Sequence, residues 1–151
     1  MRIAIAADHA GYELKRDLAA ALQAQGREVS DLGTDSTAPV DYPDCAESIA
    51  VALRDGRADR GIIVCGSGAG VSIAANKFPG VRAAVCHDSY TARQAVEHDD
   101  MNVLCLGARV IGPALAADLV AAFLGANFSG EERHRRRLDK ILAIENRFAK
   151  T

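Results

Sequence analysis

The chain has 151 residues, of which 49% are hydrophobic and 25% charged, and it contains no tryptophan. This composition excludes a disordered chain, a collagen-like repeat and an aromatic-rich binder of single-stranded nucleic acid. The net charge of −2 is uneven: residues 131–151 hold seven Lys and Arg against four Asp and Glu, and residues 1–130 hold eleven against sixteen. We therefore expect a single domain, 1–151, with an acidic body and a basic end.

The sequence also predicts where the protein resides. It contains no apolar run of the roughly 18–20 residues that a membrane span requires, so we expect no membrane partner. Asp8 and His9 end the first apolar segment early, which argues against a signal peptide. The four cysteines are widely spaced and form no C-x-x-C pair, a pattern that predicts reduced thiols, a cytoplasmic protein and no metal site.

Short apolar runs alternate with helical patterns along the chain, as in βαβ units around a parallel sheet. Strands are expected at 3–7, 28–32, 61–65, 82–86 and 103–106. Helices are expected at 14–22, from Pro43 onward, and at 71–77, 89–98 and 113–124. The second strand alternates as an edge strand does, whereas the last three are continuous apolar runs typical of interior strands. The prediction is a doubly wound α/β three-layer sandwich with five parallel strands in the order 2-1-3-4-5.

An extra C-terminal helix is expected over residues 130–149, with no strand after it. One face of this helix carries Leu138, Ile141, Leu142, Glu145 and Phe148, so it is free to cover another surface or a partner chain.

The same helix carries a basic stripe, spaced i, i+3, i+4 and i+7, which consists of Arg133, Arg136, Arg137 and Lys140. The stripe is interpreted either as a solvated face or as a clamp on a small phosphate. Nucleic acid is not expected as a partner, because the chain is acidic and lacks aromatic stacking residues.

Two chemically active segments are predicted to meet at the carboxyl edge of the sheet, where doubly wound folds bind ligands. The first strand ends in Asp8 and His9, and the third ends in Cys65 and the glycine-rich loop 66–70. Taken singly, Asp8 is a helix N-cap and His9 a turn residue. Cys65 precedes a helix N-terminus, which favours the thiolate, and it lies beside Ser67 and amides able to hold an oxyanion.

The loop 66–70 suits an anion but matches no common phosphate motif. Val71 stands where a Walker loop, a dinucleotide fingerprint or a cysteine-phosphatase loop requires another residue. Asp88 lies near the spacing of a ribose-binding acid, which leaves a nucleotide-binding module as an alternative. His98 closes a helix and is expected at the same carboxyl edge; the residues alone do not rank it above His87 or His134.

Together these segments resemble the ribose-5-phosphate isomerase B family, which also contains the galactose-6-phosphate isomerase subunits. The likeness runs from Ile3 to about Arg147, and its order and spacing are highly specific. It rests on Asp8-His9-Ala10-Gly11, Asp41-Tyr42-Pro43, Cys65 to Gly70, Ser72 to Lys77, His98-Asp99, Gly107-Ala108-Arg109, and Arg133 with Arg137.

The resemblance implies aldose–ketose isomerisation of a sugar phosphate without metal or cofactor. It implies that Cys65 is the base, that Ser67 assists the sugar oxygens, and that His98 opens the sugar ring with help from Asp8. The substrate-binding set that it implies is Asp8, His9, Tyr42, Gly66, Gly68, Ala69, Gly70, Asp99, Arg109, Arg133 and Arg137. The resemblance also implies that this chain forms a homodimer or homotetramer whose sites draw on both chains.

Two positions refine this expectation. Some relatives carry a glutamate base where this chain has Val71, so the chain resembles the cysteine type. The family usually has Asn where this chain has Asp99, and replacing an amide donor with a carboxylate bears on which sugar hydroxyl is recognised. We expect ribose 5-phosphate and ribulose 5-phosphate as the reactants, with a tetrose, hexose or other pentose phosphate as the alternative.

Overall fold

The structure, a computed structural model, describes residues 1–149. Lys150, which contributes to the basic end of the sequence, lies outside the described residues. The elements are β1 (Arg2–Ala7), α1 (Tyr12–Ala24), β2 (Glu28–Asp31), α2 (Tyr42–Arg54), β3 (Arg60–Cys65), α3 (Ala69–Ala75), β4 (Ala83–Val85), α4 (Ser89–Asp99), β5 (Val103–Gly107), α5 (Pro113–Gly125) and α6 (Glu132–Phe148). Within residues 1–149, no helix is both long and apolar enough to cross a membrane.

The five strands form one parallel sheet in the order β2-β1-β3-β5-β4. The predicted fold class is confirmed, but the predicted order 2-1-3-4-5 is wrong in its last two positions. Every residue of β5 is buried, as expected of a strand with a neighbour on each side. β4 has only three residues, all partly exposed, so it occupies the edge.

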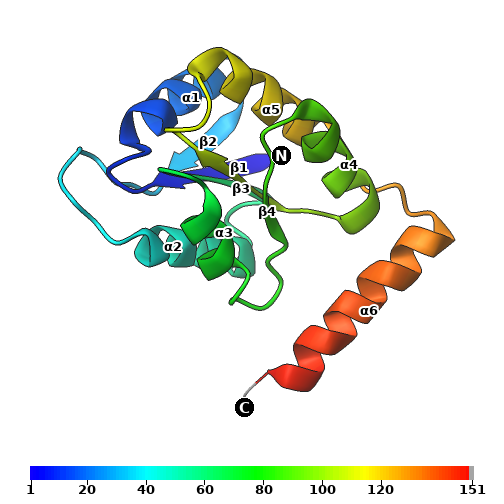
Figure 1. The fold of residues 1–151 in the computed structure, drawn as a ribbon. Helices are drawn as coiled ribbons and strands as arrows, with labels where there is room; N and C mark the ends of the chain where they lie inside the picture. Colours follow the sequence, from blue (N-terminus) through cyan, green and yellow to red (C-terminus); the bar gives the residue numbers. More distant parts are fainter. Residues whose placement is uncertain (150–151) are drawn as a thin grey trace.

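Two apolar layers cover the sheet (Figure 1). Helices α1, α4 and α5 pack on one face, where Phe123 and Leu119 are fully buried. Helices α2 and α3 pack on the other face around Ile49 and Val71. Because side chains alternate along a strand, Val64 points to the first layer and Cys65 to the second. The cysteine therefore emerges beside α2 and α3.

Helix α6 lies outside both layers and extends along the flank of the molecule (Figure 1). Its buried residues are His134 and Leu138, whereas Ile141 and Phe148 are 43% and 72% exposed. Gly80 donates a backbone hydrogen bond to Glu145 at 3.2 Å, which ties the far end of α6 to the loop before β4. The predicted helix is confirmed, and much of its apolar face is uncovered within this chain.

Candidate active site

The first strand delivers Asp8 and His9 to the carboxyl edge of the sheet. Asp8 is 7% exposed, and its carboxylate accepts hydrogen bonds from the amides of Ala10 and Gly11 at 3.0 and 3.1 Å. His9 accepts a hydrogen bond from the Val40 amide on Nδ1 at 3.2 Å, so a neutral His9 ring carries its proton on Nε2. Both side chains therefore hold local turns as well as bordering the site.

The loop after β3 surrounds the sulfur of Cys65. The Gly68 amide donates to Sγ at 3.1 Å, and the Ala69 amide donates to the Ser67 hydroxyl at 3.1 Å. Two of the loop amides are thus occupied internally. The amides of Gly66, Ser67 and Gly70 have no acceptor among residues 1–149 and remain able to hold a negative oxygen.

The other three cysteines differ from Cys65 in their surroundings. Burial raises the pKa of Cys45 and of Cys86 to about 11, and burial raises the pKa of Cys105 even further. Among the four cysteines, all within the described residues, only Cys65 accepts a hydrogen bond from an amide. Cys86 and Cys105 are 1% and 0% exposed, so they act as buried small hydrophobic residues.

Two further predicted residues border the loop. A β-carbon placed on Gly70 would lie 2.9 Å from the ring of Tyr42, so the tyrosine lies directly against the loop. A β-carbon placed on Gly66 would lie 3.6 Å from Cδ of Arg109, and the Arg109 amide donates to the Gly66 carbonyl at 3.0 Å. Asp8, His9, Tyr42, Arg109 and the loop 66–70 therefore form one half-site around Cys65.

His98 does not belong to this half-site, and its predicted place at the carboxyl edge is wrong. Helix α4 joins the carboxyl end of β4 to the amino end of β5, so it runs against the strand direction. Asp100 pairs with Arg82, the residue just before β4, at 3.0 Å. Because β3 has six residues, roughly 15–20 Å separates its two ends. Cys65 and His98 lie at opposite edges of one chain.

At the amino edge His98 has its own neighbours. Its ring stacks on the ring of His134, with centroids 3.9 Å apart, and Asp99 is exposed beside it. Arg133 and Arg137 follow on α6, both exposed; Arg133 pairs with Glu131 at 2.6 Å, and Arg137 forms no ion pair within residues 1–149. These residues form a second half-site.

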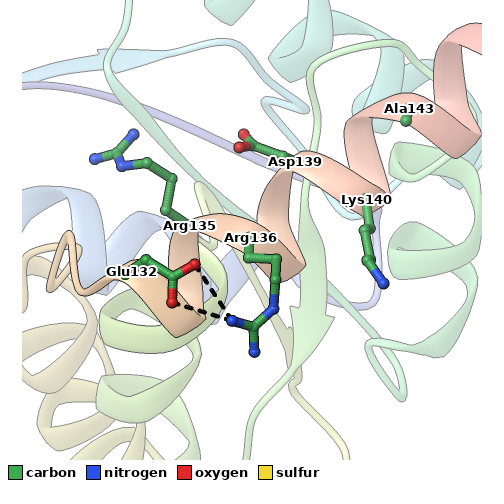
Figure 2. Close-up of a pocket in the computed structure, with 6 residues that line it drawn as sticks. All are labelled: Glu132, Arg135, Arg136, Asp139, Lys140 and Ala143. Atoms are coloured by element: carbon green, nitrogen blue, oxygen red, sulfur yellow. Dashed lines mark hydrogen bonds and ion pairs between the residues drawn. The ribbon is translucent and has the colours of Figure 1, made fainter.

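The other two residues of the basic stripe, Arg136 and Lys140, line a shallow surface of α6 together with acidic side chains (Figure 2). On this surface the two Glu132 oxygens accept hydrogen bonds from Arg136 at 3.3 and 3.0 Å. The guanidinium of Arg135 lies 5.5 Å from the centroid of the Phe128 ring. Asp139 adds a second carboxylate beside Lys140 on the same shallow surface. The mixed charges support the interpretation of Arg136 and Lys140 as a solvated face.

Asp88 and His87, which the sequence offered as candidates, and Lys15, which it did not single out, have structural roles. Asp88 caps α4 by accepting from the Thr91 amide at 2.7 Å, which explains it without a nucleotide. His87 accepts from the Gly107 amide at 3.0 Å and supports the loop that carries Arg109. Lys15 is 1% exposed and binds Asp31 at 2.8 Å and the Thr34 carbonyl at 2.6 Å.

The missed role of Lys15 had a signal in the sequence. Lys15, Leu18 and Leu22 are spaced i, i+3 and i+7, which places a lysine on the apolar face of the first helix. A buried ammonium requires a carboxylate or carbonyl partner, and these partners come from the segment that leads toward Tyr42.

No group of three or more His, Cys, Asp or Glu side chains within residues 1–149 could hold a metal ion.

Known proteins resemble this chain in sequence. The sequence profile of the Ribose/Galactose Isomerase family matches residues 3–141. Ribose-5-phosphate isomerase B of Escherichia coli (strain K12) is 47% identical over 146 residues, which cover 97% of each chain. D-erythrulose-4-phosphate isomerase of Pectobacterium atrosepticum is 46% identical over 132 residues, 86% of each chain.

The fold comparison agrees with the sequence comparison. The solved structure of ribose-5-phosphate isomerase B from Clostridium thermocellum superposes with a TM-score of 0.96 at 51% identity, covering 99% of this chain and all of that one. Both the family profile and these relatives extend over Cys65 and His98 alike. The chain therefore belongs to the ribose/galactose isomerase family and is an isomerase.

Proposed function

We propose that the protein interconverts ribose 5-phosphate and ribulose 5-phosphate through an enediolate. The observation that carries the proposal is Cys65, whose sulfur borders a loop with free amide donors. Relatives named for this reaction support it, and so does the family resemblance of the sequence. Proton abstraction beside a carbonyl requires a base, oxyanion donors and a remote anchor for the phosphate, and the two half-sites contain all three.

The proton transfer uses the half-site at the carboxyl edge. The Cys65 thiolate removes the proton from C2 of the open aldose, and the electron pair moves through the C1–C2 bond onto O1. The resulting enediolate accepts hydrogen bonds from the amides of Gly66, Ser67 and Gly70. Cys65 returns the proton to C1, O2 becomes the ketone, and the Ser67 hydroxyl assists proton movement between O1 and O2.

Ring opening uses the second half-site. His98 donates a proton to the ring oxygen as the C1–O bond breaks, and Asp8 accepts the proton of the C1 hydroxyl. Because His98 and Cys65 lie at opposite edges of one chain, His98 must come from a second copy. We therefore propose a homodimer in which each site combines Cys65 of one copy with His98 of the other.

The phosphate anchor completes this composite site. Arg109 comes from the copy that supplies Cys65, and Arg133 and Arg137 come with His98. Exposed arginines without buried partners are free to bind a dianionic phosphate in forked geometry. In this proposal His9 also binds the phosphate, Tyr42 lines the site, and Asp99 contacts a sugar hydroxyl.

The test of the substrate is an assay of the purified chain on four-, five- and six-carbon sugar phosphates. The proposal predicts the highest kcat/KM for ribose 5-phosphate and ribulose 5-phosphate. A tetrose phosphate is the second candidate, because Asp99 departs from the family and one relative at 46% identity is named for erythrulose 4-phosphate. A higher kcat/KM for erythrose 4-phosphate would contradict the pentose assignment.

A further inference from the structure

His134 is buried on a helix that is otherwise mostly exposed. It is 2% exposed, and the only other buried residue of α6 is Leu138. A buried imidazole requires a partner for its ring nitrogen, and here Nδ1 lies 2.6 Å from the hydroxyl of Ser129. The first turns of α6 thus carry a histidine that the proposed chemistry does not use.

Ser129 is itself held in place from both sides. Its hydroxyl oxygen accepts a hydrogen bond from the Glu131 amide at 3.2 Å, so its proton is free to be donated to Nδ1 of His134. Its backbone amide donates to the carbonyl of Glu97 at 2.9 Å. Because Glu97 directly precedes His98, the serine joins α6 to the last turn of α4.

The ring of His98 has two defined contacts. It stacks on His134 with 3.9 Å between centroids and 25° between planes. The side-chain amide of Gln94 lies 2.8 Å from Nδ1 of His98, so Nδ1 is engaged within the chain and Nε2 is the nitrogen left to face the substrate. The stack fixes the plane of the ring, and the Gln94 contact fixes its rotation.

Burial and the neighbouring positive charges favour the neutral form of the His134 ring. Burial lowers the pKa of His134, and the nearby His98, Arg133 and Arg137 lower it further, against the opposite effect of Glu131. A neutral ring does not repel the proton that His98 carries to the sugar. His134 can therefore act as a stacking platform while His98 changes its protonation state.

We propose that His134, held by Ser129, is a positioning residue that orients Nε2–H of His98 toward the ring oxygen of the substrate. The role rests on the proposed function, because it assigns ring opening to His98. It is confined to that step, because the ring of His134 contacts His98 and Ser129 and makes no hydrogen bond to the Cys65 loop within residues 1–149. Misplacing a reacting group by about 1 Å can lower a rate about 100-fold.

The two reactants allow ring opening and proton transfer to be measured separately. Ribose 5-phosphate closes into a furanose through its C4 oxygen and must be opened before isomerisation. Ribulose 5-phosphate cannot form a furanose, because its C5 oxygen is esterified. Exchange of its C1 proton with D₂O therefore reports proton transfer at Cys65 alone, whereas conversion of ribose 5-phosphate reports both steps.

The variants are Ser129→Ala, Ser129→Thr and His134→Phe, with circular dichroism and thermal unfolding to check their fold. Ser129→Ala is expected to lower kcat/KM for ribose 5-phosphate about 10–100-fold and to leave exchange within about threefold. Ser129→Thr retains the hydroxyl and should restore conversion. His134→Phe retains an aromatic stack without the hydrogen bond and should fall between them. Arg136→Ala, exposed on the same helix, is the matched control and should change neither rate.

Each remaining outcome decides against the proposal. Equal losses in conversion and exchange would show a general structural role for Ser129 and His134. Unchanged conversion in both Ser129→Ala and His134→Phe would show that His98 needs no such support. Failure of the unaltered protein to exchange or convert any sugar phosphate would instead remove the proposed function itself, and the separate measurement of that protein distinguishes this case.

Discussion

The sulfur of Cys65 differs from the sulfurs of the other three cysteines because it accepts a hydrogen bond from a backbone amide, at the carboxyl edge of the sheet. Replacing it should remove the base and leave the phosphate anchors intact. We predict that Cys65→Ala lowers kcat about 10²–10⁴-fold and abolishes exchange of the C1 proton of ribulose 5-phosphate with D₂O. Cys86→Ala, which removes a buried thiol elsewhere, is the control and should retain exchange. Undiminished exchange in Cys65→Ala would assign the base to another residue.

Arg137 is exposed and has no ion pair within residues 1–149, so its guanidinium is available to bind a phosphate. We predict that Arg137→Ala raises the KM for ribose 5-phosphate about tenfold or more, because a charge-assisted hydrogen bond to the substrate is lost. Arg136→Ala should leave KM unchanged, since Arg136 is already paired with Glu132 on the same helix. Steady-state kinetics of both variants checks this, and equal KM values would exclude Arg137 from the anchor.

We expect the buried His134 to make the free energy of unfolding depend on pH. Its pKa is lowered from 6.5 on folding, mainly by burial, so the unfolded chain binds its proton more tightly. Stability contributed by this residue is therefore present above about pH 6.5 and is lost as the pH falls below that value. We predict that the urea concentration at the midpoint of unfolding decreases when the pH is lowered from 7.5 to 5. The decrease should be smaller in His134→Phe. An identical decrease in both proteins would locate the titrating group elsewhere.

At the level of elements, the loop of Ser67 packs directly on the end of β5. A β-carbon on Gly107 would lie 2.6 Å from the backbone carbon of Ser67, which must then move. We predict that Gly107→Ala costs about 1–3 kcal/mol of stability and lowers kcat, because the loop amides are displaced. Gly125→Ala, with no atom within 4 Å of the added carbon, is the control. Unaltered kcat in Gly107→Ala would show that the loop tolerates displacement.

The elements were predictable because their periodicity is local. Apolar runs located four strands, alternation located the second strand, and helical spacing located the helices to within a few residues. The order of β4 and β5 depends on which strand has two neighbours, and both segments are apolar in sequence. The three partly exposed residues of β4 show that it is the edge strand only once the sheet is assembled. Strand order is thus a property of tertiary packing.

One part of the candidate site was predictable from the sequence and another part was not. Asp8, His9 and Cys65 follow strands and therefore meet at the carboxyl edge, as expected. His98 was placed wrongly because it ends a helix, and a helix returns the chain to the opposite edge. Its stack with His134 joins two residues 36 positions apart, and no spacing rule predicts such a contact.

At the scale of the whole molecule, one chain presents two half-sites at opposite edges of its sheet. Large apolar side chains are exposed near each of them: Tyr90 and Val110 at the carboxyl edge, and Ile144 and Phe148 on α6. Surfaces of this kind mark contacts between chains. In such a dimer the basic end of the sequence would contribute Arg133 and Arg137 to the phosphate anchor of the second copy's site.

A mixture of two inactive variants tests this composite site most directly. Cys65→Ala and His98→Asn are each expected to be inactive alone, because each loses one member of every site. A hybrid of the two contains one site with both defects and one intact site. Random assembly of equal amounts should therefore restore about one quarter of the activity of the unaltered protein. Activity no greater than the sum of the two variants, measured after co-refolding, would contradict a site shared between two chains.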